Sequence, residues 1–173
     1  MAVKEIFKGH VFEVIQKDFC INGKEVKRDI VIHHGGVALS CIRDQKILLV
    51  SQTRAAVEEK TLEIPAGTIE PGEDPAVTGR RELNEEAGLE CEDMKLITAF
   101  WPTPGYSTEV IYVYECSGLS EVKDRRPLDE GEDISSIWMD LDEAYKAIGD
   151  GRIRDGKTII AIYHSLIKEN QKD

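Results

Sequence analysis

The chain has 173 residues, with 33 Asp and Glu against 22 Lys and Arg, which gives a formal net charge of −11 at pH 7. This length allows one domain, or one domain with an extension, around a substantial hydrophobic core. The acidic balance argues against nucleic acid or an anionic membrane surface as a partner, and no apolar run is long enough to span a membrane. An anionic small molecule is compatible with this charge, because a bound divalent metal inverts the local field.

The first residues, MAVKEIFKGH, lack the hydrophobic core of a signal peptide, so we expect a cytoplasmic protein. The cysteines are scattered and form no CxxC pair, which argues against a structural zinc site or a disulfide framework. We interpret them as reduced and mostly buried thiols: Cys20, Cys41, Cys91 and Cys116.

Residues 8–32 alternate between apolar and polar side chains, and Asn22-Gly23 is typical of a tight turn between two strands. The sequence therefore predicts an antiparallel β-hairpin. A hairpin with so little apolar surface is not stable alone and must pack against another protein surface. We divide the chain into an N-terminal β-segment, residues 1–34, and a main domain, residues 35–173.

The main domain opens with a strand that follows Gly35-Gly36 and a second strand at residues 46–50. Gln52 and Arg54 come directly after this buried strand, where a loop can face a ligand. A guanidinium binds phosphate bidentately, although a lone arginine is more often a surface residue. The sequence predicts another short strand at residues 61–64.

Residues 74–88 carry the signals of a helix. Asp74 suits the N-cap, Pro75 suits the first helical position, and Gly88 suits a left-handed C-terminal cap. The helix brings together three acids, Glu82, Glu85 and Glu86, with Arg81 four residues before Glu85. These acids form either a solvated acidic face or a site for a hard cation such as Mg²⁺ or Mn²⁺.

The rest of the chain predicts strands at residues 94–101, 111–116 and 135–140, then helices. Residues 141–148 form one short helix, and apolar residues at helical spacing predict an amphipathic last helix: Ile159, Ile162, Tyr163, Leu166 and Ile167. His33 and His34 are adjacent on a strand and point to opposite faces, so we expect a structural or surface role for them.

The segment from Gly67 to Leu89 fits the pattern GX5EX7REUXEEXGU, where U is a bulky aliphatic residue, at every fixed position. This resembles the Nudix box, the loop–helix–loop signature of hydrolases that cleave nucleoside diphosphates linked to another group. A local departure is Thr78-Gly79, because glycine inside a helix costs about 0.5–1 kcal/mol relative to alanine unless close packing requires it.

Segments outside the box extend the resemblance over most of the chain. LEIPAG before the box, QTR at residues 52–54, PGYSTE at residues 104–109 and DEGEDI at residues 129–134 are similar to segments of the ADP-ribose pyrophosphatase branch. The resemblance implies α/β architecture: a Nudix α/β/α sandwich with a mixed β-sheet, preceded by an N-terminal antiparallel β-hairpin subdomain. It also implies a homodimer formed through residues 1–34, with residues 35–173 as the Nudix hydrolase domain.

By the same resemblance, the activity is metal-dependent hydrolysis of the pyrophosphate bond of ADP-ribose or a related nucleoside diphosphate sugar, giving AMP and ribose 5-phosphate. The cofactor is Mg²⁺, with Mn²⁺ possible. The implied metal ligands are the carbonyl of Ala66, Glu82, Glu86 and Glu132; the implied catalytic residues are Glu130, Glu85 and Arg81; the implied substrate-binding residues are Arg28, Arg54, Glu109 and His10.

Two alternatives stay open at this point. One is a broader Nudix hydrolase of dinucleoside polyphosphates or oxidised nucleotides, and the other is a ligand-sensing Nudix-like module without catalysis. Every carboxylate of the box is present, so we favour the enzyme. Gly67 and Gly72 are expected to let the loop before the helix approach other groups closely.

Overall fold

The computed structural model describes residues 3–128 and 133–171 of the chain. Its N-terminal sheet contains β1 (Val3–Lys8), β2 (Phe12–Ile21) and β3 (Lys24–His33), paired antiparallel in that order. The expected hairpin is β2–β3. Its turn has Asn22 at φ 51° and Gly23 at φ 75°, the left-handed pair that matches the twist of a two-residue hairpin. Strand β1 was not predicted, because VKEIFK is short and its pairing is interrupted by a bulge between Glu5 and Phe7.

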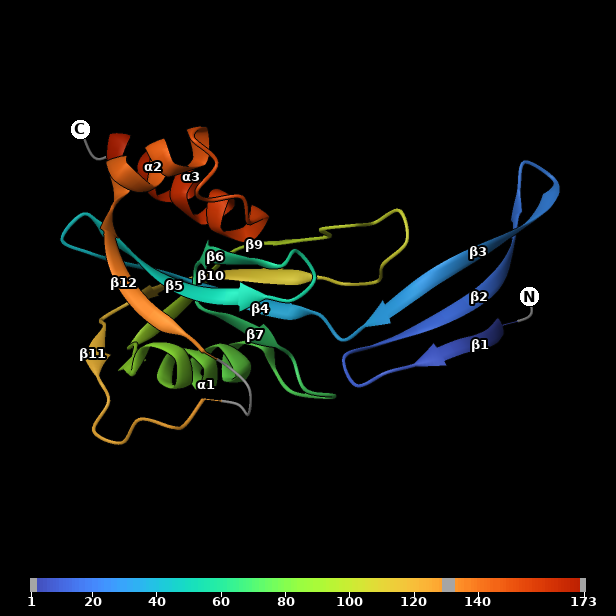
Figure 1. The fold of residues 1–173 in the computed structure, drawn as a ribbon, viewed down its shortest axis with the longest axis horizontal. Helices are drawn as coiled ribbons and strands as arrows, with labels where there is room; N and C mark the ends of the chain where they lie inside the picture. The colour runs from blue at the N-terminus through green and yellow to red at the C-terminus, as the bar shows by residue number, and fades with distance from the viewer. Residues whose placement is uncertain (1–2, 129–132, 172–173) are drawn as a thin grey trace.

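The N-terminal sheet extends away from the rest of the molecule (Figure 1). None of the described residues 3–33 is buried, in agreement with the expectation that this segment has no core of its own. It is joined to the main domain by hydrogen bonds between the end of β3 and the loop at residues 101–110. The Val31 amide donates to the Tyr106 carbonyl at 2.7 Å, and the Thr108 amide donates to the Val31 carbonyl at 2.9 Å.

The main sheet is mixed, as predicted. Its strand order is β12–β5–β4–β10–β9, with β6 paired to β5 and β7 paired to β4. Strands β4 and β10 are parallel, and the other pairs are antiparallel. The strands are β4 (Gly36–Arg43), β5 (Lys46–Arg54), β6 (Glu59–Glu63), β7 (Ala66–Thr68), β9 (Asp93–Phe100), β10 (Ile111–Ser117) and β12 (Ser135–Asp140). A small separate sheet pairs β8 (Leu89–Glu90) with β11 (Ser120–Glu121).

Strand β5 is longer than the sequence indicated. Pairing with β6 continues as far as Arg54, opposite Glu59, so Gln52 and Arg54 lie on the strand and not in a loop after it. Backbone hydrogen bonding to β6 overrides the polar character of these residues. Because they are two apart on a strand, their side chains share one face.

Helices cover both faces of the main sheet (Figure 1). Helix α1 (Pro75–Ala87) lies on one face, and α2 (Leu141–Gly149) and α3 (Gly156–Asn170) lie on the other. Alternate residues of β4 divide between the two cores: Val37 and Leu39 pack with Leu83 of α1, while Ala38 packs with Ile162 of α3. The predicted Nudix α/β/α sandwich is therefore confirmed.

Close packing explains the glycine inside α1. A Cβ at Gly79 would lie 2.7 Å from Met94 Cε and 3.0 Å from Leu39 Cδ2, so a larger residue would require the side chains that pack against the helix to shift. Among the described helices, none combines the length and the apolar character that crossing a membrane requires.

Candidate active site

Helix α1 holds the glutamates of the box beside the loop that precedes it. Both caps are formed as predicted: the Asp74 side chain accepts a hydrogen bond of 2.8 Å from the Ala76 amide, and Gly88 is left-handed at φ 66°. Glu86 is only 2 % exposed, and its Oε2 accepts a hydrogen bond of 3.0 Å from the Ala66 amide. Helix α1 and strand β7 are thus fixed relative to each other.

Glu82 lies directly against the backbone of Gly67. A Cβ at Gly67 would fall 2.0 Å from the Glu82 carboxyl, so glycine is needed there for close approach, as predicted. Gly72 has a different role. A Cβ added there would have no atom within 4 Å, so close approach does not require glycine, but its φ of 82° favours glycine.

A cavity of about 160 Å³ lies beside Glu82 and Gly67, and we name it the acidic cleft. It is lined by Gln52, Arg54, Ala66, Gly67, Thr68, Glu70, Arg81, Glu82 and Glu86.

Arg81 holds the acids together. Its NH1 lies 2.7 Å from Glu82 Oε1 and donates to Glu85 Oε2 at 3.0 Å, which confirms the expected i,i+4 pair. Burial alone would lower the pKa of Arg81, but the negative charges of Glu82, Glu85 and Glu73 outweigh it and raise the pKa. Glu85 does not line the acidic cleft; it contacts Arg81 and lies 3.7 Å from Arg126.

The acidic cleft offers oxygen ligands to a divalent cation. Glu82, Glu86 and the Ala66–Gly67 backbone converge there, and carboxylate and carbonyl oxygens are the donors that Mg²⁺ and Mn²⁺ take. The missing Cβ of Gly67 leaves the backbone next to a carboxylate. Within the described residues, no three His, Cys, Asp or Glu side chains are arranged to hold a metal by themselves. The residues present fit a metal held by two carboxylates, a backbone carbonyl and further ligands.

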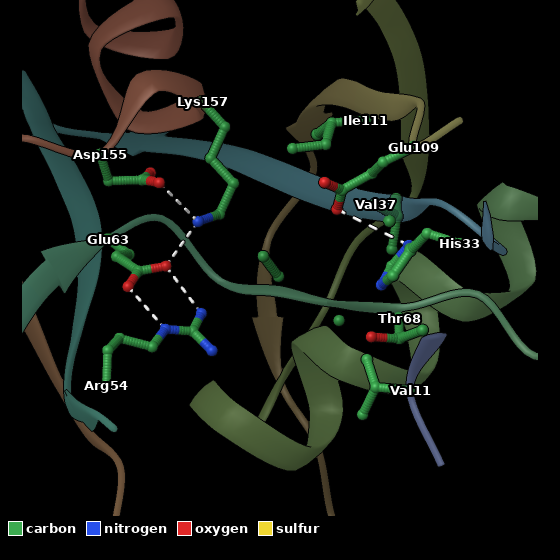
Figure 2. Close-up of a pocket in the computed structure, with 13 residues that line it drawn as sticks. Val11, His33, Val37, Arg54, Glu63, Thr68, Glu109, Ile111, Asp155 and Lys157 are labelled. Atoms are coloured by element: carbon green, nitrogen blue, oxygen red, sulfur yellow. Dashed lines mark hydrogen bonds and ion pairs between the residues drawn. The ribbon is translucent and has the colours of Figure 1, made fainter. Parts of the chain in front are cut away.

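A second cavity, the main pocket, adjoins the acidic cleft and has a volume of about 400 Å³. Figure 2 shows its lining, which comes from the N-terminal segment, the main sheet and the start of α3. Arg54, Ala66, Gly67 and Thr68 line both cavities. The other lining residues are Val11, His33, Gly36, Val37, Glu63, Glu109, Ile111, Asp155 and Lys157.

One end of the main pocket carries an ionic network. Arg54 donates from Nε to Glu63 Oε1 and from NH2 to Glu63 Oε2, both at 2.8 Å, and Lys157 Nζ donates to Glu63 Oε2 at 2.5 Å (Figure 2). Burial would raise the pKa of Glu63, but the hydrogen bonds from Arg54 and Lys157 and the charge of Lys157 outweigh it and lower the pKa to about 2. Glu63 is therefore a carboxylate at neutral pH.

The other end of the pocket is formed by His33 and Glu109. His33 Nδ1 accepts a hydrogen bond of 3.0 Å from the Gly35 amide and lies 3.7 Å from Glu109 Oε1. An Nδ1 that accepts leaves the proton of the neutral ring on Nε2. The Glu109 amide donates to Ser107 Oγ at 3.1 Å, which fixes the loop at residues 104–109.

The structure brings together most of the predicted site residues. Arg54 and Glu109 lie in the main pocket; Ala66, Glu82, Glu86 and Arg81 lie in the acidic cleft. Arg28 and His10 are not brought into either cavity of their own chain. Both are exposed, and Arg28 NH1 donates to the Lys27 carbonyl. Glu130 and Glu132 lie outside the described residues.

Four polar residues of the main pocket are not predicted as site residues from the sequence: His33, Glu63, Asp155 and Lys157. His33 was assigned a structural or surface role because adjacent strand histidines diverge, but this divergence is what leaves one ring facing the pocket. A signal for Lys157 exists in the sequence, since a lysine in the first turn of a helix, two residues after the N-cap Asp155, opposes the helix dipole. Nothing in the sequence alone connects them to Glu63.

Comparison with known proteins agrees with this geometry. Residues 33–161 match the NUDIX domain. The chain is 42% identical to the methanol dehydrogenase activator of Bacillus methanolicus over 99% of its length and 94% of that protein, and 38% identical to the ADP-ribose pyrophosphatase of Bacillus subtilis over 98% and 92%. The ADP-ribose pyrophosphatase of Mycobacterium tuberculosis is 32% identical over 81% of this chain and 69% of that protein.

A solved structure has the same fold. The crystal structure of an ADP compounds hydrolase superimposes with a TM-score of 0.81 at 20% identity, over 99% of this chain and 92% of that one. The domain match, the relative at 38% identity and the complete box on α1 agree with one another. The chain therefore belongs to the Nudix hydrolases, in their ADP-ribose pyrophosphatase branch.

Proposed function

We propose that the enzyme hydrolyses the pyrophosphate bond of ADP-ribose or a related nucleoside diphosphate sugar, giving AMP and ribose 5-phosphate. The observation that carries this proposal is the placement of Arg54. It lines both the acidic cleft and the main pocket, so a diphosphate that spans the two cavities passes its guanidinium. An organic group on one side of the diphosphate then has a cavity of about 400 Å³ to occupy.

The acidic cleft supplies the chemistry. Glu82, Glu86 and the Ala66 carbonyl would hold Mg²⁺ or Mn²⁺, and the bound ion would supply charge to neutralise phosphate oxygens and to activate water. Arg81 keeps Glu82 and Glu85 in place through contacts of 2.7 and 3.0 Å. Glu85, which faces Arg81 and not the cleft, orients these groups or contributes to a second ion.

The loop acids complete the proposed machinery. We assign Glu130 as the base that activates water and Glu132 as a metal ligand; both lie outside the described residues, so this assignment rests on the resemblance of DEGEDI to its relatives. At the far end of the main pocket, Glu109 accepts hydrogen bonds from ribose hydroxyls, and the adjacent His33 closes the pocket wall.

The N-terminal sheet supports a homodimer. Large apolar side chains are exposed on it: Val3, Ile6, Phe7, Val11, Phe12 and Ile21. Arg28 pairs with Lys17 and lies five residues from His33 on β3, so the two side chains leave opposite faces of the strand. A contact between Arg28 and substrate therefore comes from the partner subunit, and His10 is assigned in the same way.

A substrate panel tests the activity. With Mg²⁺ and then Mn²⁺, kcat/KM is measured for ADP-ribose, other nucleoside diphosphate sugars, a dinucleoside polyphosphate and an oxidised nucleoside triphosphate. We expect ADP-ribose or another diphosphate sugar to have the highest kcat/KM. A clear preference for the dinucleoside polyphosphate or the oxidised nucleotide would contradict the proposal.

The relative from Bacillus methanolicus gives a second candidate function, activation of a methanol dehydrogenase, favoured by 42% identity over nearly the whole chain. The candidate is tested by adding the purified chain to a methanol dehydrogenase assay. Activation by wild type that Glu86→Gln loses would show that activation depends on the hydrolytic site. Activation that Glu86→Gln retains would show a role separate from hydrolysis.

A further inference from the structure

Lys157 is a nearly buried cation in the wall of the main pocket, and the proposed hydrolysis has not used it. Its side chain is 10% exposed and lies in the first turn of α3. A cation in the first turn opposes the helix dipole, and an ammonium is rarely buried without a partner. Helix stability therefore does not account for a lysine here. Residues that break a local rule in this way are expected at functional sites.

Two carboxylates fix the ammonium. Lys157 Nζ donates to Glu63 Oε2 at 2.5 Å and to Asp155 Oδ1 at 2.9 Å (Figure 2). Asp155 is the N-cap of α3, and its Oδ2 accepts hydrogen bonds from the Thr158 amide at 3.0 Å and the Thr158 hydroxyl at 2.5 Å. The Ile64 amide donates to the same hydroxyl at 2.8 Å. The start of α3 is thus bonded both to Glu63 and to the backbone that leads into Ala66.

Glu63 connects Lys157 to Arg54. Each Glu63 oxygen accepts two hydrogen bonds: Oε1 from Arg54 Nε and Thr61 Oγ1, and Oε2 from Arg54 NH2 and Lys157 Nζ. The carboxylate is therefore held in one orientation, and the guanidinium that binds it edge-on is held with it. These bonds use Nε and NH2 of Arg54, so NH1 takes no part in binding Glu63.

The charges of the network also indicate that Arg54 can bind an anionic ligand. Without Lys157, the negative charge of Glu63 would be balanced by Arg54 alone among the groups that bond to it, and the Arg54–Glu63 pair would be neutral. With Lys157, Glu63 is shared between two cations; Lys157 also bonds to Asp155, whose charge the N-terminus of α3 stabilises in addition. Part of the Arg54 charge then stays available to an anionic ligand.

We propose that Lys157 is a positioning residue: through Glu63 it orients Arg54 and keeps its guanidinium available to the substrate pyrophosphate. This inference rests on the proposed function, which supplies the pyrophosphate. It assigns a role in the active site to the C-terminal helix, which contributes no residue to the box.

The test compares Lys157→Met with Lys168→Met in steady-state hydrolysis of ADP-ribose at saturating Mg²⁺. Lys168 lies on the same helix, pairs with Glu115 and does not line the main pocket. Its substitution by Met therefore removes the same charge from α3 outside the pocket. We expect Lys157→Met to raise KM about tenfold while kcat changes less than about threefold, because a binding interaction is removed. Lys168→Met should keep the wild-type KM, and Lys157→Arg should recover part of the loss.

A double mutant distinguishes positioning from general damage. If Lys157 acts through Arg54, Lys157→Met should add little to the KM of Arg54→Lys, because coupled residues are not additive. Fully additive effects, or an unchanged KM in folded Lys157→Met, would overturn the inference while leaving the proposed function intact. If thermal unfolding measurements show that Lys157→Met is not folded, Lys157→Gln is measured in its place. Fully additive effects or an unchanged KM in Lys157→Gln would then overturn the inference.

Calorimetry with ADP-ribose separates this inference from the proposed function. If wild type binds ADP-ribose but hydrolyses no nucleoside diphosphate sugar of the panel, the proposed function fails, and the same comparison of Lys157→Met with Lys168→Met is made on the dissociation constant for ADP-ribose. A rise confined to Lys157→Met supports the inference, and equal dissociation constants overturn it. If wild type neither binds nor hydrolyses ADP-ribose or any other nucleoside diphosphate sugar of the panel, both proposals are overturned.

Discussion

Gly67 and Glu82 are in direct contact, and a Cβ added at residue 67 would lie 2.0 Å from the Glu82 carboxyl. The contact joins β7 to Glu82, the first acid that α1 contributes to the acidic cleft. It also explains in physical terms why the box begins with glycine, since any side chain there would displace a carboxylate proposed to bind metal.

Gly67→Ala should therefore impair activity more than stability. We expect kcat/KM for ADP-ribose to fall at least about tenfold and the Mg²⁺ concentration for half-maximal rate to rise, as measured by metal titration. Gly149→Ala is the control, because nothing lies within 4 Å of its Cβ direction. An active Gly67→Ala with unchanged metal dependence would show that this contact has no role in the site.

The two loop glutamates should have different phenotypes. Glu130→Gln should lower kcat by about 10²–10⁴-fold, the range for a general base, with little change in the metal concentration needed. Glu132→Gln should raise that concentration and be partly rescued by excess metal. The measurement is kcat as a function of Mg²⁺. Wild-type kcat in both variants would mean that both are solvated loop acids, and exchanged phenotypes would mean that the two roles are reversed.

Glu63 should make stability depend on pH in the acid range. Its pKa is lowered from 4.5 to about 2 in the folded state, so the folded state binds fewer protons than the unfolded state between these values. The stabilisation is present above about pH 4.5 and is lost as pH falls toward 2. In denaturant titrations, the free energy of unfolding of wild type should fall more steeply than that of Glu63→Gln between these pH values. Parallel curves would contradict the ionic network.

Subunit mixing tests whether Arg28 acts across the dimer. Arg28→Ala and Glu86→Gln should each be nearly inactive. If they are unfolded and refolded together, a mixed dimer has one site with both an intact Glu86 and the partner's Arg28, so about a quarter of all sites regain activity. Light scattering measures the dimer. No recovery in a proven dimer would place Arg28 in its own subunit or outside the site.

Prediction from sequence was most successful where the signals are local. The caps of α1, the Arg81–Glu85 pair and the turn at Asn22-Gly23 are each determined by residues within one or two turns of chain. Arg54 was identified as a ligand residue but placed in a loop, because its pairing depends on β6. Strand β1 was missed because its pairing with β2 contains a bulge.

The ionic network was beyond sequence reasoning for a physical reason. Lys157 and Glu63 are 94 residues apart and meet only because α3 packs its first turn against the end of β6. Taken alone, each has an ordinary explanation, a charged residue at a helix start or at a strand end. The role that we propose for them follows from the tertiary contact, which no local pattern encodes.

The most direct test of the account is release of AMP from ADP-ribose with and without the acids of the cleft. Wild type, Glu86→Gln and the exposed control Glu90→Gln are assayed over a range of Mg²⁺ concentrations, with AMP and ribose 5-phosphate identified by chromatography. We expect wild type and Glu90→Gln to release both products only with metal, and Glu86→Gln to lose about 10²-fold or more in kcat/KM while remaining folded. AMP release by Glu86→Gln at the wild-type rate and metal dependence would contradict the account.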